Sequence, residues 1–231
     1  MELKERLRLA AQLIEPGWRV ADIGTDHAYL PVELVRRGAA QSAIACDIGA
    51  GPCEAARRTV AAAGLGARIA VRQGDGLTPL APDEVDAAVI AGMGGKAIAG
   101  ILARSLPLAK SLRRLVLQPM NAAALLRNWL LENGWEIVEE ELALEDARLY
   151  EIIAVEPARA ARPAPKPLLL EIGPLLWRQR HPLLKMHIER LLAREKRVLA
   201  GMEGSEAARR TGKYERAQEK CEQLEAYLKC L

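Results

Sequence analysis

The chain of 231 residues is long enough for one medium domain with an appendage or for two domains, and half of its residues are hydrophobic. Because it has no Phe and only 3% aromatic residues, its core must be built from Leu, Ile, Val and Ala. It has no apolar run of about 18 residues, no signal-peptide pattern and no Cys-x-x-Cys pair among its four cysteines. We therefore expect a reduced, cytoplasmic protein without a membrane span.

The net charge of +3 is unevenly distributed along the chain. Residues 1–156 hold 17 Lys and Arg against 21 Asp and Glu, whereas residues 157–231 hold 16 against 9. A basic segment joined to an acidic domain favours a polyanionic partner, although a solvated pair of charged helices would have the same composition. We expect two domains with these boundaries.

Short β-like runs alternate with helical patterns over the first two thirds of the chain, after an expected opening helix at Lys4–Ile14. This alternation predicts an α/β fold with a mainly parallel sheet and helices on both faces. The expected strands are Arg19–Ile23, Ala43–Asp47, Ile69–Gln73, Asp86–Ala91 and Arg114–Gln118. The expected helices between them are Tyr29–Gly38, Pro52–Ala63, Lys96–Ser105 and Ala122–Asn133.

Two further β-like runs, Trp135–Leu142 and Leu149–Val155, end this domain. The link between them has no room for a helix, so they must form a hairpin, and one strand must run against the parallel sheet. This ending is typical of class I methyltransferases and not of the common doubly wound dinucleotide dehydrogenases. The pattern therefore favours binding of S-adenosylmethionine over binding of a nicotinamide cofactor.

A proline-rich linker, Glu156–Pro167, precedes a tail with two apolar seams at helical spacing. The seams are Leu184, Ile188, Leu191, Val198 and Met202, then Tyr214, Ala217, Cys221, Leu224 and Leu228. They predict an antiparallel helical hairpin of coiled-coil type, with its turn at Glu203–Lys213. Its candidate RNA-binding cations, seven along the first helix and three at the turn, are Arg178, Arg180, Lys185, Arg190, Arg194, Lys196, Arg197, Arg209, Arg210 and Lys213.

Candidate ligand-binding residues follow the first expected strand. Asp22 lies in that strand, Gly24 lets the backbone approach a ligand closely, and only this one of the usual three glycines is present. Asp26 and His27 stand where a cofactor would lie, so we expect both at the active site.

The ends of the other strands carry further candidates. Asp47, with Ile48 beside it, is placed to accept hydrogen bonds from ribose hydroxyls, although it is also a common strand-end residue. The carboxylate in Gly74-Asp75-Gly76 is placed to accept from an adenine amino group, although Asp-Gly is also a common turn pair. Gly92 and Met93 open a glycine-rich loop before Lys96, which we interpret as the start of an exposed helix. Asn121 is either a substrate contact or a helix N-cap.

The motifs Asp22-Ile23-Gly24-Thr25-Asp26-His27-Ala28-Tyr29-Leu30-Pro31, Gly92-Met93-Gly94-Gly95 and Leu117-Gln118-Pro119-Met120 together resemble the bacterial tRNA (adenine-22-N1)-methyltransferase family, TrmK. The resemblance spans essentially the whole chain. It implies a Rossmann-like class I methyltransferase with a seven-stranded sheet and a C-terminal coiled coil. It also implies S-adenosylmethionine as cofactor, tRNA as partner and N1 of adenine 22 as the methyl acceptor.

Within that interpretation, Asp26 would stabilise the cationic product, and His27 would hydrogen-bond the base or take a proton from its amino group. The chain departs from the family pattern at Met120, which follows the proline directly where a polar residue is expected; Asn121, one position later, would contact the substrate. We expect no metal site, because no ligand spacing is present, and a monomer as the state that suits tRNA. The alternatives are a methyltransferase of small molecules or proteins whose tail serves assembly, a catalytically silent RNA-binding protein, and a nicotinamide enzyme.

Overall fold

The computed structural model describes residues 3–160, 163, 165–202 and 211–231. The chain divides into two compact units, Met1–Ala164 and Pro165–Leu231. The division therefore falls inside the proline-rich linker, after Ala164 and not after Glu156.

The first unit contains one seven-stranded sheet in the order β3-β2-β1-β4-β5-β7-β6. Its strands are β1 (Trp18–Ile23), β2 (Ala40–Asp47), β3 (Ile69–Gln73), β4 (Ala87–Met93), β5 (Arg114–Pro119), β6 (Trp135–Glu145) and β7 (Arg148–Pro157). Strands β1 to β5 pair in parallel, whereas β7 runs antiparallel to both β5 and β6. The predicted mainly parallel sheet with one reversed strand is confirmed.

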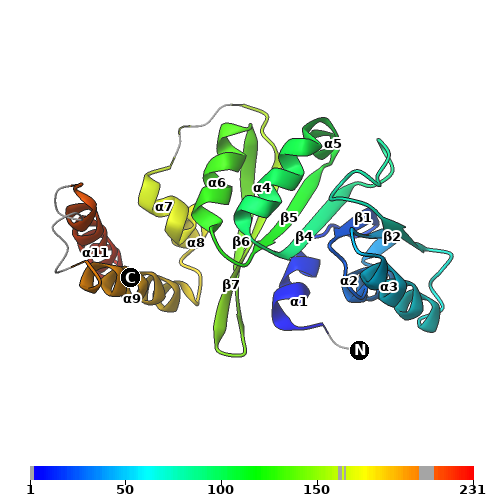
Figure 1. Cartoon of the computed structure of the whole chain (residues 1–231), viewed down its shortest axis with the longest axis horizontal. Helices are drawn as coiled ribbons and strands as arrows, with labels where there is room; N and C mark the ends of the chain where they lie inside the picture. Colours follow the sequence, from blue (N-terminus) through cyan, green and yellow to red (C-terminus); the bar gives the residue numbers. More distant parts are fainter. Residues whose placement is uncertain (1–2, 161–162, 164, 203–210) are drawn as a thin grey trace. The chain divides into compact units, whose positions relative to one another are not determined.

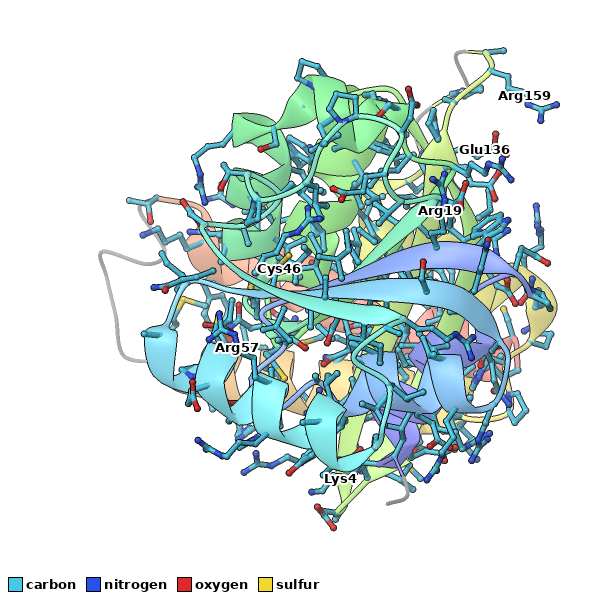
Figure 2. All side chains as sticks on the ribbon, turned by 90° about the vertical axis from the view of Figure 1, so that its right-hand side faces the viewer. Lys4, Arg19, Cys46, Arg57, Glu136 and Arg159 are labelled. Atoms are coloured by element: carbon cyan, nitrogen blue, oxygen red, sulfur yellow. The ribbon has the colours of Figure 1, made fainter. Side chains whose placement is uncertain are left out.

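Helices cover both faces of this sheet (Figure 1). They are α1 (Glu5–Gln12), α2 (Tyr29–Arg36), α3 (Ala50–Ala62), α4 (Gly95–Arg104), α5 (Leu106–Ser111) and α6 (Ala123–Glu132). On one face, Leu13 and Ile14 after α1, Val35 of α2 and Val60 of α3 pack with sheet residues into one apolar cluster. Two residues labelled in Figure 2 illustrate the difference between core and surface: Cys46 of β2 is fully buried, whereas the side chain of Arg57 of α3 is 52% exposed.

The hairpin at the edge of the sheet is longer than the sequence predicted. Its strands extend to Glu145 and from Arg148, so the link is only the two-residue turn Asp146-Ala147. Both turn residues have positive φ, +48° and +59°, which is the geometry that matches the twist of a tight hairpin. The sequence did not predict this turn, because neither residue is glycine.

The second unit holds α7 (Pro167–Ile172), α8 (Pro174–Gln179), α9 (Leu184–Ala200) and α11 (Lys213–Lys229). Helices α9 and α11 pack against each other. The end of α11 lies near the start of α9, where Arg180 Nη1 donates to Cys230 O at 2.8 Å, so the two helices run antiparallel as predicted. The short helices α7 and α8 were not predicted, because each is a six-residue segment beginning with proline.

One residue of the apolar seam predicted for α9, Val198, does not face the helix pair's buried side. Val198 is 47% exposed, whereas Leu184, Ile188 and Leu191 are buried. The buried position near this end of the helix is taken by Glu195, whose carboxylate lies 3.0 Å from Lys220 Nζ. An ion pair therefore replaces apolar packing there, and a pattern of apolar residues does not reveal it.

Candidate active site

The candidate site lies at the carboxyl ends of the parallel strands, where the strand order reverses between β1 and β4. The loops that leave β1, β2 and β3 are tied together by backbone hydrogen bonds. The N–H groups of Gly24 and Thr25 donate to Cys46 O at 2.8 and 3.0 Å, and Gly74 N–H donates to Asp47 O at 2.9 Å. These bonds bring the predicted residues of three separate strands to one place.

Two hollows open at this edge, and Gly24 lines both. The first, here called the strand-end hollow, has a volume of about 380 Å³. It brings together most of the predicted cofactor residues, namely Gly24, Asp47, Ile48, Gly74, Asp75, Gly76 and Met93. The second, here called the α1 hollow, has a volume of about 520 Å³ and is lined by Asp22, Asp26, His27 and Gly92, with residues of α1 and α2.

The strand-end hollow has the donor and acceptor chemistry of a nucleoside site. Asp47 accepts one hydrogen bond from Gly49 N–H at 2.8 Å through Oδ1. Asp75 forms a 3.0 Å ion pair with Arg104 and lies between two glycines. Ile48 is 67% exposed beside them and offers an apolar surface to a flat ring. These groups fit the ribose, amino group and ring of an adenosine.

Backbone constraints explain two of the glycines here. Gly24 has a φ of +76°, and a Cβ at this position would lie 2.2 Å from Met93 Cε. Gly76 has a φ of +59°, and its Cβ would lie 2.7 Å from Ile101 Cγ2 of α4. A side chain at either position would be strained in its backbone and crowded by its neighbour.

Asp22 differs from the other carboxylates because it is buried. Its pKa is raised to about 6, mainly by burial; the 2.6 Å hydrogen bond from Thr25 Oγ1 opposes the rise, and the charge of Asp47 adds to it. Asp22 lines the α1 hollow, and its raised pKa brings its titration close to neutral pH.

Asp26 and His27 lie on the loop between β1 and α2. Asp26 has a φ of +48° and a side chain that is 71% exposed, and Ala28 has a φ of +55°. His27 Nε2 lies 3.5 Å from Asp26 Oδ2, and the His27 ring stacks on Tyr29 with ring centres 5.1 Å apart. Left-handed backbone at non-glycine residues is costly, and such strain is found often at functional sites.

The loops that leave β4 and β5 pack on each other. Met120 N–H donates to Met93 O at 2.8 Å, and Gly95 N–H donates to Asn121 O at 3.0 Å. A Cβ on Gly95 would lie only 2.6 Å from Ala122 O, so the absence of a side chain at Gly95 allows the two loops to pack closely. The N-cap alternative for Asn121 is wrong, because the N-cap of α6 is Ala122, in a left-handed conformation.

Several lining residues were not identified from the sequence. Helix α4 supplies Lys96, Ala97, Gly100, Ile101 and Arg104 to the strand-end hollow, so our interpretation of Lys96 as merely the start of an exposed helix was incomplete. A glycine in the middle of α4 was the available signal, since glycine in a helix often marks a close approach. Arg6 and Tyr29 also line the α1 hollow. Tyr29 belongs to the first motif but was given no role, and no motif included Arg6.

In the second unit, only part of the predicted RNA-binding set lies on the first long helix. Arg178 lies on α8 and Arg180 follows it, because the turn near His181 separates α8 from α9. Arg194 pairs with Glu171, and Lys196 pairs with Glu225. Lys185, Arg190 and Arg197 are exposed on α9, Lys213 begins α11, and Arg209 and Arg210 lie outside the described residues.

Within the described ranges, no group of three or more His, Cys, Asp or Glu residues is arranged to hold a metal ion. The helices in those same ranges are too short or too polar to cross a membrane.

Comparison with known proteins is consistent with this geometry. Residues 20–226 match the family model of TrmK, tRNA (adenine(22)-N(1))-methyltransferase. The tRNA (adenine(22)-N(1))-methyltransferase of Bacillus subtilis is 42% identical over 156 residues, which are 68% of this chain and 66% of that protein.

Solved structures extend the similarity to the whole chain. The crystal structure of Bacillus subtilis TrmK has a TM-score of 0.89 at 32% identity and covers 98% of this chain and 99% of its own. The Streptococcus pneumoniae protein Sp1610, solved in complex with S-adenosyl-L-methionine, has a TM-score of 0.86 at 33% identity and covers 98% and 100%. The chain therefore belongs to the TrmK family of tRNA (adenine(22)-N(1))-methyltransferases, enzymes of the S-adenosylmethionine-dependent class.

Proposed function

We propose that the chain performs its family's reaction, methylation of N1 of adenine 22 in tRNA, across the two hollows that meet at Gly24. The adenosine part of S-adenosylmethionine occupies the strand-end hollow, and the target adenine enters the α1 hollow. The observation that supports this arrangement most directly is that Gly24, which has no side chain of its own, lines both hollows.

Each of the proposed cofactor residues binds a different part of S-adenosylmethionine. Asp47 accepts from the ribose hydroxyls, Asp75 accepts from the adenine amino group, and Ile48 covers the ring. Gly24, Gly74 and Gly76 allow the backbone to approach. When bound, S-adenosylmethionine supplies a methyl group already activated by its sulfonium charge.

The protein's catalytic contribution is position and charge. Adenine N1 carries a lone pair, so no covalent intermediate with the protein is needed. In paired RNA that lone pair is engaged in hydrogen bonding, so the target base must be unpaired and displaced into the hollow. The loops at Gly92–Gly95 and Gln118–Asn121 frame that position, with Asn121 as a contact to the base.

Asp26 and His27 act on the charge of the product. Methylation leaves a cationic adenine, and the exposed carboxylate of Asp26 stabilises the charge as it develops. His27, held between Asp26 and Tyr29, either hydrogen-bonds the base or takes a proton from its amino group. Asp22, which lines the same hollow, supports this loop through its hydrogen bond from Thr25.

The second unit binds the body of the tRNA through its exposed cations. Because Arg194 and Lys196 already pair with glutamates, most of the attraction comes from Arg178, Lys185, Arg197 and Lys213, with Arg209 and Arg210 beyond the described residues. We also infer that the enzyme acts as a monomer in the cytoplasm, which its four free cysteines support.

The decisive experiment is transfer of labelled methyl from S-adenosylmethionine to unmodified tRNA, with the product nucleoside identified by mass spectrometry. The expected product is 1-methyladenosine, and it should disappear when adenine 22 is replaced by guanine. The matched tRNA with another unpaired adenine replaced should remain a substrate. Cofactor binding without any methylation of tRNA would contradict the proposal.

A further inference from the structure

Arg6 joins three separate elements beside the α1 hollow. It lies in the first turn of α1, and its side chain is 24% exposed. Its backbone N–H donates to Glu145 Oε2 at 3.2 Å, and its Nε lies 3.7 Å from Glu145 Oε1. Its Nη1 donates to Gln118 Oε1 at 3.1 Å. One guanidinium therefore connects α1, the tip of the β6–β7 hairpin and the end of β5.

Gln118 passes this connection to the neighbouring strand. Its side chain is fully buried, and Oε1 accepts a second hydrogen bond, from Gly92 N–H at 3.1 Å. Both neighbours of this oxygen are donors, so only the carbonyl end of the amide fits there. The amide nitrogen donates to Pro119 O at 3.1 Å. Arg6, Gln118 and Gly92 thus form a clamp, which holds together the exits of β4 and β5.

The hairpin holds the start of α1 from the other side. Lys4 Nζ lies 3.6 Å from Glu145 and 3.3 Å from Asp146, at the lower edge of the molecule in Figure 2. The Arg6 guanidinium also lies 5.8 Å from the centre of the Tyr150 ring on β7. Arg6 is therefore fixed on several sides and does not turn freely in solvent.

From these contacts we propose that Arg6 is a positioning residue for methyl transfer, which acts through Gln118 and Gly92 to fix the loops that frame the target adenine. This inference rests on the proposed placement of the adenine in the α1 hollow. Arg6 does not line the strand-end hollow, so its effect falls on turnover and not on cofactor affinity. A displacement of about 1 Å in such a frame costs about 100-fold in rate.

The test compares Arg6→Ala and Arg6→Lys with the matched control Arg8→Ala in the full-length enzyme. Arg8 lies on the same helix, but among the described residues its ion-pair partner is Glu5, one turn away on α1. We expect Arg6→Ala to lower kcat about 10- to 100-fold, with the Kd for S-adenosylmethionine within about 3-fold of wild type. Arg6→Lys should recover little of the lost kcat, because an ammonium lacks the planar guanidinium group that reaches both Glu145 and Gln118. The kcat of Arg8→Ala should stay within about 2-fold of the wild-type value.

A double-mutant cycle with Gln118→Met separates positioning from general destabilisation. If Arg6 acts through Gln118, the double variant should lose no more kcat than the worse single variant. Full additivity of the two kcat losses, or an unchanged kcat in Arg6→Ala, would overturn the inference about Arg6. The proposed function would still stand in that case, as long as the wild-type enzyme methylates adenine 22. A larger loss in cofactor affinity than in kcat would also overturn it and would assign Arg6 to the cofactor. Absence of wild-type methylation would instead refute the proposed function.

Discussion

The left-handed backbone at Asp26 makes Asp26→Asn the substitution that tests its carboxylate alone, because asparagine tolerates a φ of +48° and keeps the shape of the side chain. We expect turnover on tRNA to fall by about 10²- to 10⁴-fold, since the developing positive charge loses its counter-charge. Cofactor affinity should change little. Single-turnover methylation and titration with S-adenosylmethionine measure the two effects separately, and near wild-type turnover would exclude the proposed role.

Asp22 makes the stability of the protein depend on pH in the opposite sense to ion-paired carboxylates such as Glu84, whose pKa is lowered. Its pKa of about 6 in the fold lies above the usual carboxyl value of about 3.9, so the folded state binds its proton more tightly than the unfolded state. The free energy of unfolding should therefore fall as the pH rises from about 4 to about 7. Relative to Asp22→Asn, the wild-type protein should lose up to about 3 kcal/mol over this range.

Urea unfolding of both proteins at several pH values measures this difference. The Asn variant keeps an acceptor for Thr25 Oγ1, so the comparison isolates the charge. Parallel stability curves for the two proteins would show that Asp22 does not titrate in this range.

At the scale of elements, a buried ion cluster joins α6 to the hairpin. Arg127 of α6 lies 2.6 Å from Glu140 of β6 and 2.7 Å from Glu151 of β7. Burial alone lowers the pKa of Arg127, but the two carboxylates outweigh it and raise that pKa above its ordinary value. Arg127→Met should therefore cost about 3–5 kcal/mol, because it leaves buried carboxylates without their cation.

Chemical denaturation checks this expectation, with Arg57→Met on the outer side of α3 as the control. The control should change stability by no more than about 0.5 kcal/mol, since Arg57 is exposed (Figure 2). Adding Glu140→Gln and Glu151→Gln to Arg127→Met should restore part of the loss. Equal effects of Arg127→Met and Arg57→Met would contradict the role of the cluster.

The elements differ in how far the sequence alone could predict them. The five parallel strands and the hairpin follow from local apolar runs and link lengths, and Asp22, Gly24 and Asp47 follow from their positions at strand ends. The contributions of α4 and Arg6 depend on how distant elements pack, which no local pattern contains. Glu195, Glu140 and Arg127 are buried only because each finds a partner far along the chain.

At the scale of the whole molecule, the basic charge of the second unit is not equally available to a polyanionic partner, because some of its cations already form ion pairs. Arg178, Lys185 and Lys213 are exposed and form no ion pair within the described part of the chain. By contrast, Arg194 lies 3.1 Å from Glu171, and Lys196 lies 2.7 Å from Glu225. The first three are therefore available to phosphates, whereas the other two are partly neutralised within their own unit.

This difference predicts how tRNA affinity depends on salt. Each phosphate contact adds roughly 0.7–0.9 to the slope of log affinity against log salt concentration, so Arg178→Gln, Lys185→Gln and Lys213→Gln together should reduce the slope by about 2–3. Arg194→Gln with Lys196→Gln should reduce it by less than about 1, because those cations gain little on binding. Fluorescence titration of tRNA at several salt concentrations measures the slopes, with S-adenosylmethionine affinity as the internal control. If the two sets of substitutions reduced the slope equally per cation, ion pairing within the second unit would not decide which cations bind tRNA.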